Sequence, residues 1–237
     1  MLPVERRWVV PQRQPAMEEE IARSLGTSRV MAQVLINRGL TETKTAELFL
    51  SGKKEAPFPP LSGLEAAAAR ILAAAGRKER VLVYGDYDVD GITATVLLRS
   101  ALEELGIDTG HYIPDRLNEG YGLNREAVAR AAKQGYRVIV TVDCGISSHD
   151  EVELARTLGV DVVITDHHDP PEELPPACAV VNPKLDQAES QLAGVGVAYR
   201  LACSLLEAAK GPQYSCRVSE YLDLVALGTV ADVVPLL

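Results

Sequence analysis

Hydrophobic spacing changes near residue 60 of this 237-residue chain. Residues 17–40 and 41–52 place apolar side chains at helical intervals, with irregular stretches between them, and the proline-rich segment APFPPLSG follows. Proline fixes φ and lacks an amide donor, so a cluster of prolines is typical of a connector. We therefore expect residues 1–60 to form a small helical N-terminal extension and a linker.

From residue 64 onward, short apolar runs alternate with segments whose apolar positions recur at helical intervals. The runs that predict strands are 80–84, 111–114, 137–142, 161–166 and 178–182. The segments that predict helices are 64–78, 93–106, 124–135, 149–159, 194–209 and 218–234. The last two are so rich in apolar residues that we expect both helices to lie in the core.

The expected strands are apolar at successive positions, which is typical of strands buried on both faces of a parallel sheet. Residues 61–237 therefore predict one α/β domain: a doubly wound, mostly parallel sheet with helices on both faces. In such sheets, ligands bind beyond the carboxyl ends of the strands. Side chains that follow the expected strands are therefore candidates for a functional site.

Acidic and imidazole side chains follow three of these strands: Asp86, Asp88 and Asp90 follow 80–84, Asp143 follows 137–142, and Asp166, His167 and His168 close or follow 161–166. A further acid, Asp232, lies within the apolar segment 218–234. Carboxylates and imidazoles that converge in one place are ligands for Mg²⁺, Mn²⁺ or Zn²⁺. Without cations, such a cluster of like charges is unfavourable by kilocalories per pair. We therefore expect two divalent cations at this edge of the sheet, with an aspartate between them.

Local structure offers another interpretation for each acid taken alone. An aspartate after a strand forms a turn or caps a helix, although only one of Asp86, Asp88 and Asp90 can cap the same helix. Asp232 could be satisfied by helix backbone or by Arg217. A phosphorylated receiver domain also gathers acids at strand ends, but it needs a lysine after a later strand. Lys184 follows Asn-Pro instead, and paired histidines have no role there.

The net charge of the chain does not rule out the metal-site interpretation. The chain has 33 acidic and 24 basic residues, a formal net charge of −9, which taken alone counts against a nucleic-acid-binding protein. Carboxylates that hold cations, however, are neutralised when the metal binds.

Four widely spaced cysteines without a CxxC pair argue against a zinc knuckle or a disulfide framework. The lack of a signal-peptide core and of an apolar run of about 20 residues leads us to expect a cytoplasmic protein with no membrane partner.

Four segments together resemble the motifs of the DHH phosphoesterase superfamily: GDYDVDGITA, TVDCGIS, TDHH and GTVAD. Within it, the stretches YIPDRLNEGYGLN, LPPACAVVNPK and LAGVGVAYRL are similar to the RecJ-type exonucleases. The resemblance implies a metal-dependent hydrolase that degrades single-stranded DNA from 5′ to 3′, with a role in DNA repair and recombination. It also implies two divalent cations, Mn²⁺ or Mg²⁺, that activate water.

The resemblance assigns roles by motif. It implies these metal ligands: Asp86, Asp88, Asp90, Asp143, His167 and Asp232. Asp143 would bridge the cations, and Asp86 lies where relatives often have another ligand. His168 would contact the scissile phosphate, and Asp166 would orient the histidines, so that Asp143, Asp166 and His168 form the catalytic group.

Contacts to the substrate are expected from two further segments. Arg116 and Asn118 could reach phosphate oxygens, although Arg116 could equally pair with Glu119. The amides near Gly194 and Gly196 could bind a phosphate at a helix N-terminus, although tight helix packing explains the same glycines. Tyr121 could stack on a base or pack against its own protein.

The resemblance covers the catalytic half of RecJ-type proteins, and we expect the second small domain and the OB-fold of full-length relatives to be absent. The segment NPKLDQAESQLAG departs from the relatives, and we interpret it as loop variation. We expect a monomer that binds single-stranded DNA, with a single-strand-binding protein or a helicase as partner. Two alternatives stay open: a DHH phosphodiesterase for short oligoribonucleotides or cyclic dinucleotides, and a non-catalytic scaffold of the RecJ type.

Overall fold

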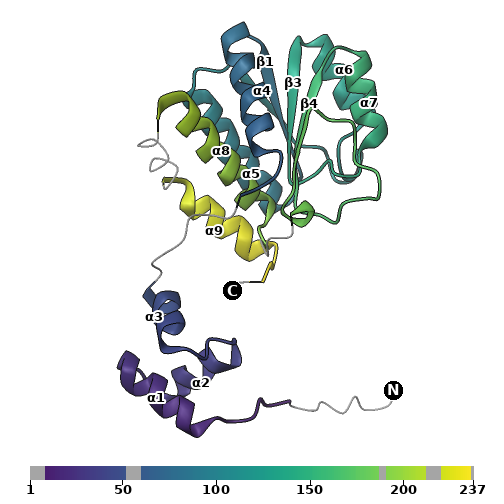
Figure 1. Ribbon diagram of the computed structural model, residues 1–237. Helices are drawn as coiled ribbons and strands as arrows, with labels where there is room; N and C mark the ends of the chain where they lie inside the picture. The colour runs from purple at the N-terminus through teal and green to yellow at the C-terminus, as the bar shows by residue number, and fades with distance from the viewer. Residues whose placement is uncertain (1–8, 52–59, 187–190, 212–219, 236–237) are drawn as a thin grey trace, which may run out of the picture. The chain divides into compact units, whose positions relative to one another are not determined.

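The computed structural model describes residues 9–51, 60–186, 191–211 and 220–235 (Figure 1). The chain divides into two compact units, Met1–Phe58 and Pro59–Leu236, and each is described by itself. The division falls close to residue 60, where the hydrophobic spacing changes. Within the described ranges, no helix is both long enough and apolar enough to cross a membrane.

Within residues 9–51, the first unit has three short helices, α1 (Pro15–Leu25), α2 (Arg29–Asn37) and α3 (Thr43–Ser51). Ser28 caps α2, because its hydroxyl accepts a hydrogen bond of 3.1 Å from the amide of Met31. The helices share a small buried core, which consists of Ile21, Ala32, Leu35, Ile36 and Ala46. The helical spacing of the N-terminal segment therefore predicts its local structure correctly.

The second unit is built on one parallel sheet. Its strands are β1 (Arg80–Gly85), β2 (Thr109–Tyr112), β3 (Tyr136–Val142), β4 (Asp161–Thr165) and β5 (Ala179–Val181). They lie in the order β2-β1-β3-β4-β5, and every described pair is parallel. The strand order reverses between β1 and β3, and the carboxyl ends of strands at such a switch point form a crevice for ligands.

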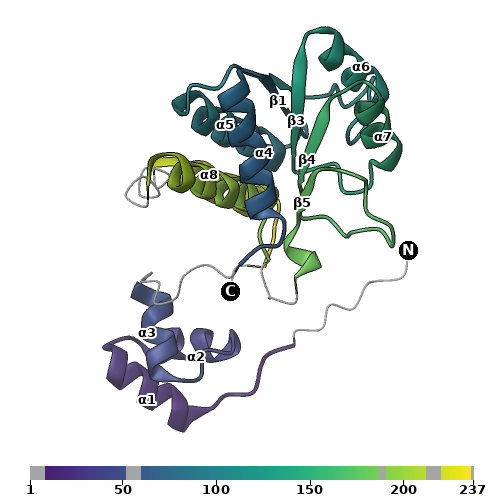
Figure 2. The ribbon, with the colours of Figure 1, turned by 45° about the horizontal axis from the view of Figure 1, so that its top comes forward.

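Helices cover both faces of this sheet (Figures 1 and 2). One face carries α4 (Leu64–Arg77), α5 (Val89–Glu104) and α8 (Gly194–Lys210), which bury strand residues such as Val81 and Val83. The alternate strand residues, such as Leu82 and Tyr84, point to the other face. That face is covered by α6 (Arg125–Lys133) and α7 (His149–Thr157). The predicted doubly wound α/β fold is therefore confirmed.

The prediction that both C-terminal helices lie in the core is wrong for α9 (Leu222–Ala231). Only Gly228 of this helix is buried, while Leu222, Leu227 and Val230 are exposed. The helix packs on α5 and α8 rather than on the sheet. Because α4, α5 and α8 already cover that face, α9 forms an outer layer with one side in solvent.

Two expected element boundaries also move, for local reasons. The helix expected from residue 93 begins at Val89, because the carboxylate of Asp88 accepts a 3.0 Å hydrogen bond from the amide of Gly91 and caps α5. The strand expected at 111–114 ends at Tyr112. Pro114 cannot donate to a strand ladder, so pairing stops before it. The earlier start of α5 places Asp90 on its first turn.

Candidate metal centre

Three neighbouring strands deliver acids to the same edge of the sheet. Asp86 follows β1, Asp143 follows β3 and Asp166 follows β4, and β3 lies between β1 and β4. The amide of Asp143 donates to the carbonyl of Thr165 at 3.0 Å, and the amide of Asp166 donates to Val181 at 3.1 Å. Backbone pairing therefore continues one residue past each strand and holds both aspartates at defined positions.

The first turn of α5 brings Asp90 into this edge. Asp90 is buried, and its two carboxylate oxygens accept hydrogen bonds from the amides that open α8, those of Gly194 at 2.6 Å and Val195 at 2.9 Å. Each oxygen keeps a second lone pair, so the carboxylate is fixed in orientation but still able to bind a cation. The N-terminus of α8 thus positions a candidate ligand.

Asp143 lies at the centre of the acids in an unusual backbone conformation. Its φ is +62°, a region that non-glycine residues seldom occupy, and its side chain is buried. A Cβ on Gly194 would lie 2.6 Å from the Cβ and Oδ1 of Asp143. The absent side chain at Gly194 therefore makes the space in which the Asp143 carboxylate sits.

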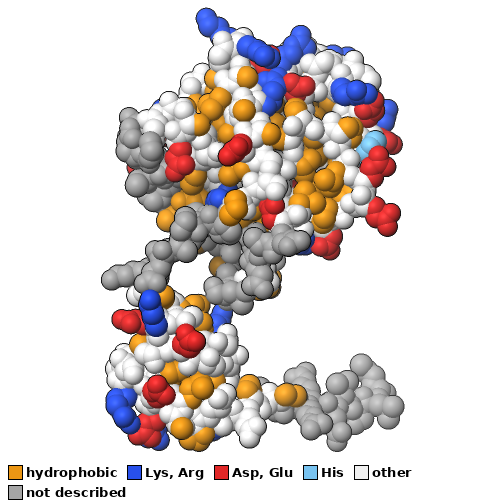
Figure 3. All heavy atoms as spheres, in the orientation of Figure 1, with side chains coloured by type: hydrophobic (Ala, Val, Ile, Leu, Met, Phe, Trp, Pro, Cys, Tyr) orange, Lys and Arg blue, Asp and Glu red, His pale blue; other side chains and the backbone are white. Residues whose placement is uncertain are grey.

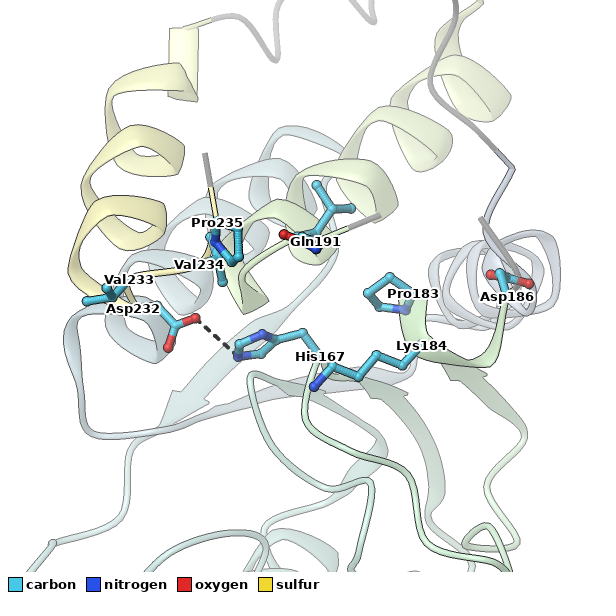
Figure 4. Close-up of a pocket in the computed structure, with 10 residues that line it drawn as sticks. His167, Pro183, Lys184, Asp186, Gln191, Asp232, Val233, Val234 and Pro235 are labelled. Atoms are coloured by element: carbon cyan, nitrogen blue, oxygen red, sulfur yellow. Dashed lines mark ion pairs between the residues drawn. The ribbon is translucent and has the colours of Figure 1, made fainter. Parts of the chain in front are cut away.

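His167 joins the acids from the strand ends to Asp232, the residue that caps the C-terminus of α9. Its Nε2 lies 3.1 Å from Asp143 Oδ1, 3.8 Å from Asp90 Oδ2 and 3.7 Å from Asp232 Oδ2. Figure 4 shows the imidazole of His167 facing the Asp232 carboxylate. Arg217, the other partner considered for Asp232, lies outside the described residues.

The ligand-type atoms form two triads that meet at Asp143 and His167. One consists of Asp86, Asp88 and Asp143, and the other of Asp90, His167 and Asp232, with the atoms of each triad within 4.8 Å of one another. His168 also lies within this distance of Asp143 and His167. The structure therefore brings together all the metal ligands expected from the sequence, and it places Asp86 beside Asp88.

Buried atoms without partners indicate what this space is built to hold. Asp86 Oδ1, Asp143 Oδ1 and His167 Nε2 are all buried and lack a hydrogen-bond partner. The 3.1 Å approach of His167 Nε2 to Asp143 Oδ1 is an ion-pair distance, but its geometry does not make a hydrogen bond. Native proteins seldom leave buried polar atoms unsatisfied. Carboxylate oxygens with an imidazole suit a divalent cation, so the donor set fits the metals expected from the sequence.

Burial makes the negative charge of these aspartates unfavourable in the metal-free protein. Burial, together with the charges of Asp90 and Asp88, raises the pKa of Asp143 to about 10. Burial also raises the pKa of Asp86 and of Asp90, although backbone amides oppose the shift at both. The basic residues Arg77, Lys78 and Arg80 lie where α4 ends and β1 begins, at the opposite end of the strand from Asp86, so they supply no countercharge. Figure 3 shows Lys and Arg side chains gathered at the top of the unit that contains the sheet. A bound cation would supply the countercharge.

The carboxylate of Asp166 contacts both histidines of the motif, and the orienting role that the resemblance implies stays a prediction. This carboxylate accepts hydrogen bonds from the amides of His167 at 2.7 Å and Ile146 at 2.9 Å, and lies 2.7 Å from Nδ1 of His168. Burial raises the pKa of Asp166, but the hydrogen bonds from His168 and from backbone amides outweigh burial and lower the pKa. The same hydrogen bond raises the pKa of His168. His168 therefore stays protonated over a wider pH range than an ordinary histidine.

The family model described as "DHH family, N-terminal domain" matches residues 80–229, which include every candidate ligand except Asp232. The chain belongs to the DHH family. The second unit, Pro59–Leu236, which we call the DHH unit, carries the motif Asp166-His167-His168 at the end of β4, where the two ligand triads meet.

Curated relatives and solved structures agree with this assignment. The single-stranded-DNA-specific exonuclease RecJ of Bacillus subtilis (strain 168) is 39% identical over 241 residues, which cover 100% of this chain and 30% of that protein. RecJ of Escherichia coli (strain K12) is 42% identical over 218 residues, 87% of this chain and 37% of that protein. The chain thus spans about a third of the length of these relatives.

Two solved structures bear on the fold and on the metal. A crystal structure of exonuclease RecJ bound to manganese has a TM-score of 0.69 and 41% identity, and covers 76% of this chain and 46% of that one. RecJ from Thermus thermophilus in complex with Mn²⁺ has a TM-score of 0.75 and 32% identity, with coverage of 95% and 32%. The resemblance inferred from the motifs is therefore confirmed.

The residues predicted to contact substrate make contacts within the DHH unit. The Arg116 guanidinium lies 5.2 Å from the ring centroid of Tyr87, and Asn118 donates to the Asp115 carboxylate at 3.1 Å. Glu119, the alternative partner of Arg116, accepts from the Asp115 amide at 2.8 Å. Tyr87 went unnoticed in the sequence, where its place between Asp86 and Asp88 is the one indication of its proximity to the site. The substrate roles of Arg116 and Asn118 stay predictions.

Glycines near the site serve close packing in this structure. The Gly194 amide is bonded to Asp90, and the Gly196 amide donates to the Ala193 carbonyl at 2.9 Å, so phosphate binding by these amides stays a prediction. A Cβ on Gly228 would lie 2.8 Å from Asp90 Oδ1. The sequence analysis did not identify Gly228 as part of the site. The signal that could have found it is its place one helical turn before Asp232.

Tyr121 contacts His168 through both its hydroxyl and its ring. Its Oη lies 3.1 Å from His168 Nδ1, and the two rings meet edge to face with centroids 5.6 Å apart. The Tyr121 side chain is still half-exposed. Packing against its own protein is therefore observed, and stacking on a base stays a prediction.

Replacing Gly194 with alanine should weaken Mn²⁺ binding about tenfold or more, the usual cost of disturbing a group that positions metal ligands. The new Cβ would force Asp143 out of its place, since it would overlap the carboxylate. Isothermal titration with Mn²⁺ measures the effect. Gly196→Ala is the matched control on the same helix, because its Cβ would meet only side-chain atoms of Leu192, at 3.2 Å or more. Equal affinities in the two variants would contradict the positioning role.

Proposed function

We propose that the DHH unit is a two-metal phosphodiesterase that removes nucleotides from the 5′ end of single-stranded DNA. The observation that carries the proposal is the pair of ligand triads that meet at Asp143 and His167, with three buried ligand atoms left without partners. The names of the relatives support the substrate, since they are single-stranded-DNA-specific exonucleases. The solved relatives are complexes with Mn²⁺ and Mg²⁺ and support the choice of metal.

One cation would be held by Asp86, Asp88 and Asp143, and the other by Asp90, His167 and Asp232. When bound, such a pair of cations activates water and neutralises charge on the phosphate that is attacked. The oxygen-rich donor set favours Mg²⁺ or Mn²⁺ over a soft metal. No protein nucleophile is needed, and the only described cysteine close to the acids, Cys144, is fully buried with its pKa raised by burial.

His168 would act on the substrate rather than on the cations. Its side chain is 44% exposed, beside a ligand triad, and its proton is held on by Asp166. A protonated imidazole in this place can donate a charge-assisted hydrogen bond to the scissile phosphate. Asp166, which is fully buried, would fix the direction of that bond.

The test is Mn²⁺-dependent hydrolysis of a 5′-labelled single strand, compared with duplex DNA, a short oligoribonucleotide and a cyclic dinucleotide. We expect mononucleotides from the single strand, and a chelator should stop their release. Equal rates on duplex and single strand would contradict the proposed specificity. Faster hydrolysis of the short RNA or the cyclic dinucleotide would favour the small-substrate alternative. Binding of metal without any hydrolysis would favour the scaffold.

We further propose that the chain acts in the cytoplasm, in DNA repair and recombination, as a monomer. Single strands exposed by a helicase, or coated by a single-strand-binding protein, would supply its substrate. The support is the named activity of the bacterial relatives, which requires access to single-stranded DNA.

A further inference from the structure

The imidazole of His168 has a firm partner at one nitrogen and open space beside it. The Asp166 carboxylate lies 2.7 Å from its Nδ1, but one hydrogen bond at one ring atom leaves the tilt of the ring free. A cavity of about 330 Å³ adjoins the ring, and His168 and Asp166 line it together with Tyr121. This space leaves room for the ring to turn, so a second contact decides its orientation.

Tyr121 supplies that second contact. Its Oη lies 3.1 Å from Nδ1 and 3.4 Å from Nε2 of His168, so the hydroxyl restrains the ring and not a single atom of it. The same hydroxyl donates to the backbone carbonyl of Asp143 at 3.4 Å. The rings of Tyr121 and His167 both pack on His168, with centroids 5.6 Å and 4.5 Å from its own. Tyr121 thus joins His168 to the end of β3, where Asp143 lies.

The backbone around Tyr121 is held at a defined place. Tyr121 lies between Gly120 and Gly122, whose φ values are +78° and +87°, a region that glycine enters without strain. The carbonyl of Gly122 accepts a hydrogen bond of 2.9 Å from the hydroxyl of Tyr84, a fully buried residue of β1. The side chain of Asn124, which caps α6, donates to the same hydroxyl at 3.2 Å. The loop that carries Tyr121 is therefore fastened to the sheet directly after it.

Given the proposed nuclease activity, on which this inference rests, we propose that Tyr121 is a positioning residue. Its hydroxyl fixes the imidazole of His168 in the direction from which His168 contacts the scissile phosphate. Without the hydroxyl, the ring would also occupy orientations turned toward the cavity, and a smaller fraction of bound substrate would be in a productive geometry. The hydroxyl of Tyr121 is then the part that matters, whereas stacking on a base would need only the ring.

Tyr121→Phe and Tyr121→Leu separate the hydroxyl from the ring. Tyr121→Phe should lower kcat for Mn²⁺-dependent hydrolysis of a single strand about tenfold and leave KM within about twofold, because the contact acts on the reacting phosphate and not on strand binding. Tyr121→Leu should lower kcat at least as much. Tyr136→Phe is the matched control, since its hydroxyl lies 3.3 Å from Arg80 Nη2 at the start of β3, the opposite end of the strand from Asp143. It should leave kcat and KM unchanged.

Imidazole ¹⁵N spectra of the metal-free chain follow His168 without turnover. Tyr121→Phe should move the Nδ1 resonance of His168, which His168→Gln assigns, and leave the resonances of His111 and His149 in place. Unchanged His168 resonances would overturn the proposal, as would an equal loss of kcat in Tyr136→Phe. Wild-type kcat in Tyr121→Phe with KM raised only in Tyr121→Leu would overturn it as well and assign the ring to base stacking. Because the spectra need no hydrolysis, a failure here is distinguishable from a failure of the proposed nuclease activity.

Discussion

Asp143→Asn should lower Mn²⁺-dependent hydrolysis by about 10²–10³-fold or more, the loss expected when a central charge-stabilising group is removed. The same variant should raise the midpoint of thermal unfolding of the metal-free chain. Asp143 is buried among like charges, and asparagine keeps its shape without the charge. Mn²⁺ should raise that midpoint in the wild-type chain and change it little in the variant, because binding to the native state stabilises it.

The raised pKa of Asp143 also predicts how the free energy of unfolding of the metal-free chain changes with pH. The pKa of Asp143 is raised to about 10 in the folded, metal-free chain, so its protonated form favours folding. That contribution is fully present below the ordinary aspartate pKa of about 4 and is lost as the pH rises toward about 10. Cations bind the ionised form, so Mn²⁺ affinity should rise over the same range. Asp143→Asn should flatten both dependences.

Thermal unfolding followed by circular dichroism, with and without Mn²⁺, checks these statements. Asp150→Asn is the matched control, since the Asp150 side chain is 83% exposed and lies outside the ligand triads. It should change neither the activity nor the response to metal. A metal-free Asp143→Asn variant that is less stable than the wild type would contradict the electrostatic argument.

Asp166→Ala should lower the free energy of unfolding by about 3–5 kcal/mol, the range for removing one partner from a buried charged network. The carboxylate accepts from three backbone amides, those of Ile146, His167 and His168, and from the His168 ring. Alanine would leave the buried amides of Ile146 and His167 without this acceptor. Hydrolysis should fall as well, because the His168 ring would lose its carboxylate partner and keep the weaker contact with the Tyr121 hydroxyl.

Urea unfolding at neutral pH measures this loss. Asp169→Ala, three residues further along the same loop, is the control, because its carboxylate is 92% exposed and its ion pair with Lys184 is solvated. It should cost less than about 1 kcal/mol. A cost below about 1 kcal/mol for Asp166→Ala would mean that the network around the histidines is not what holds the β4 end in shape.

Short-range patterns in the sequence predict most of the fold. Apolar runs such as 137–142 become strands because a chain buried on both faces needs apolar side chains at every position. Parallel strands bring their carboxyl ends to one edge, so the sequence predicts that Asp86, Asp143 and Asp166 lie on that edge. The strand order, which the tertiary structure sets, makes β1, β3 and β4 neighbours and brings the three acids together.

Tertiary structure decided how each of these groups is held. Asp90 is bound by the amides of Gly194 and Val195, 104 and 105 residues away, and no local pattern records such a partner. The exposed side of α9 likewise depends on which helices already cover the sheet. Side-chain spacing determines burial and element type because these are properties of neighbouring residues. Hydrogen-bond partners and the room left by a missing Cβ depend on elements that meet only in the folded chain.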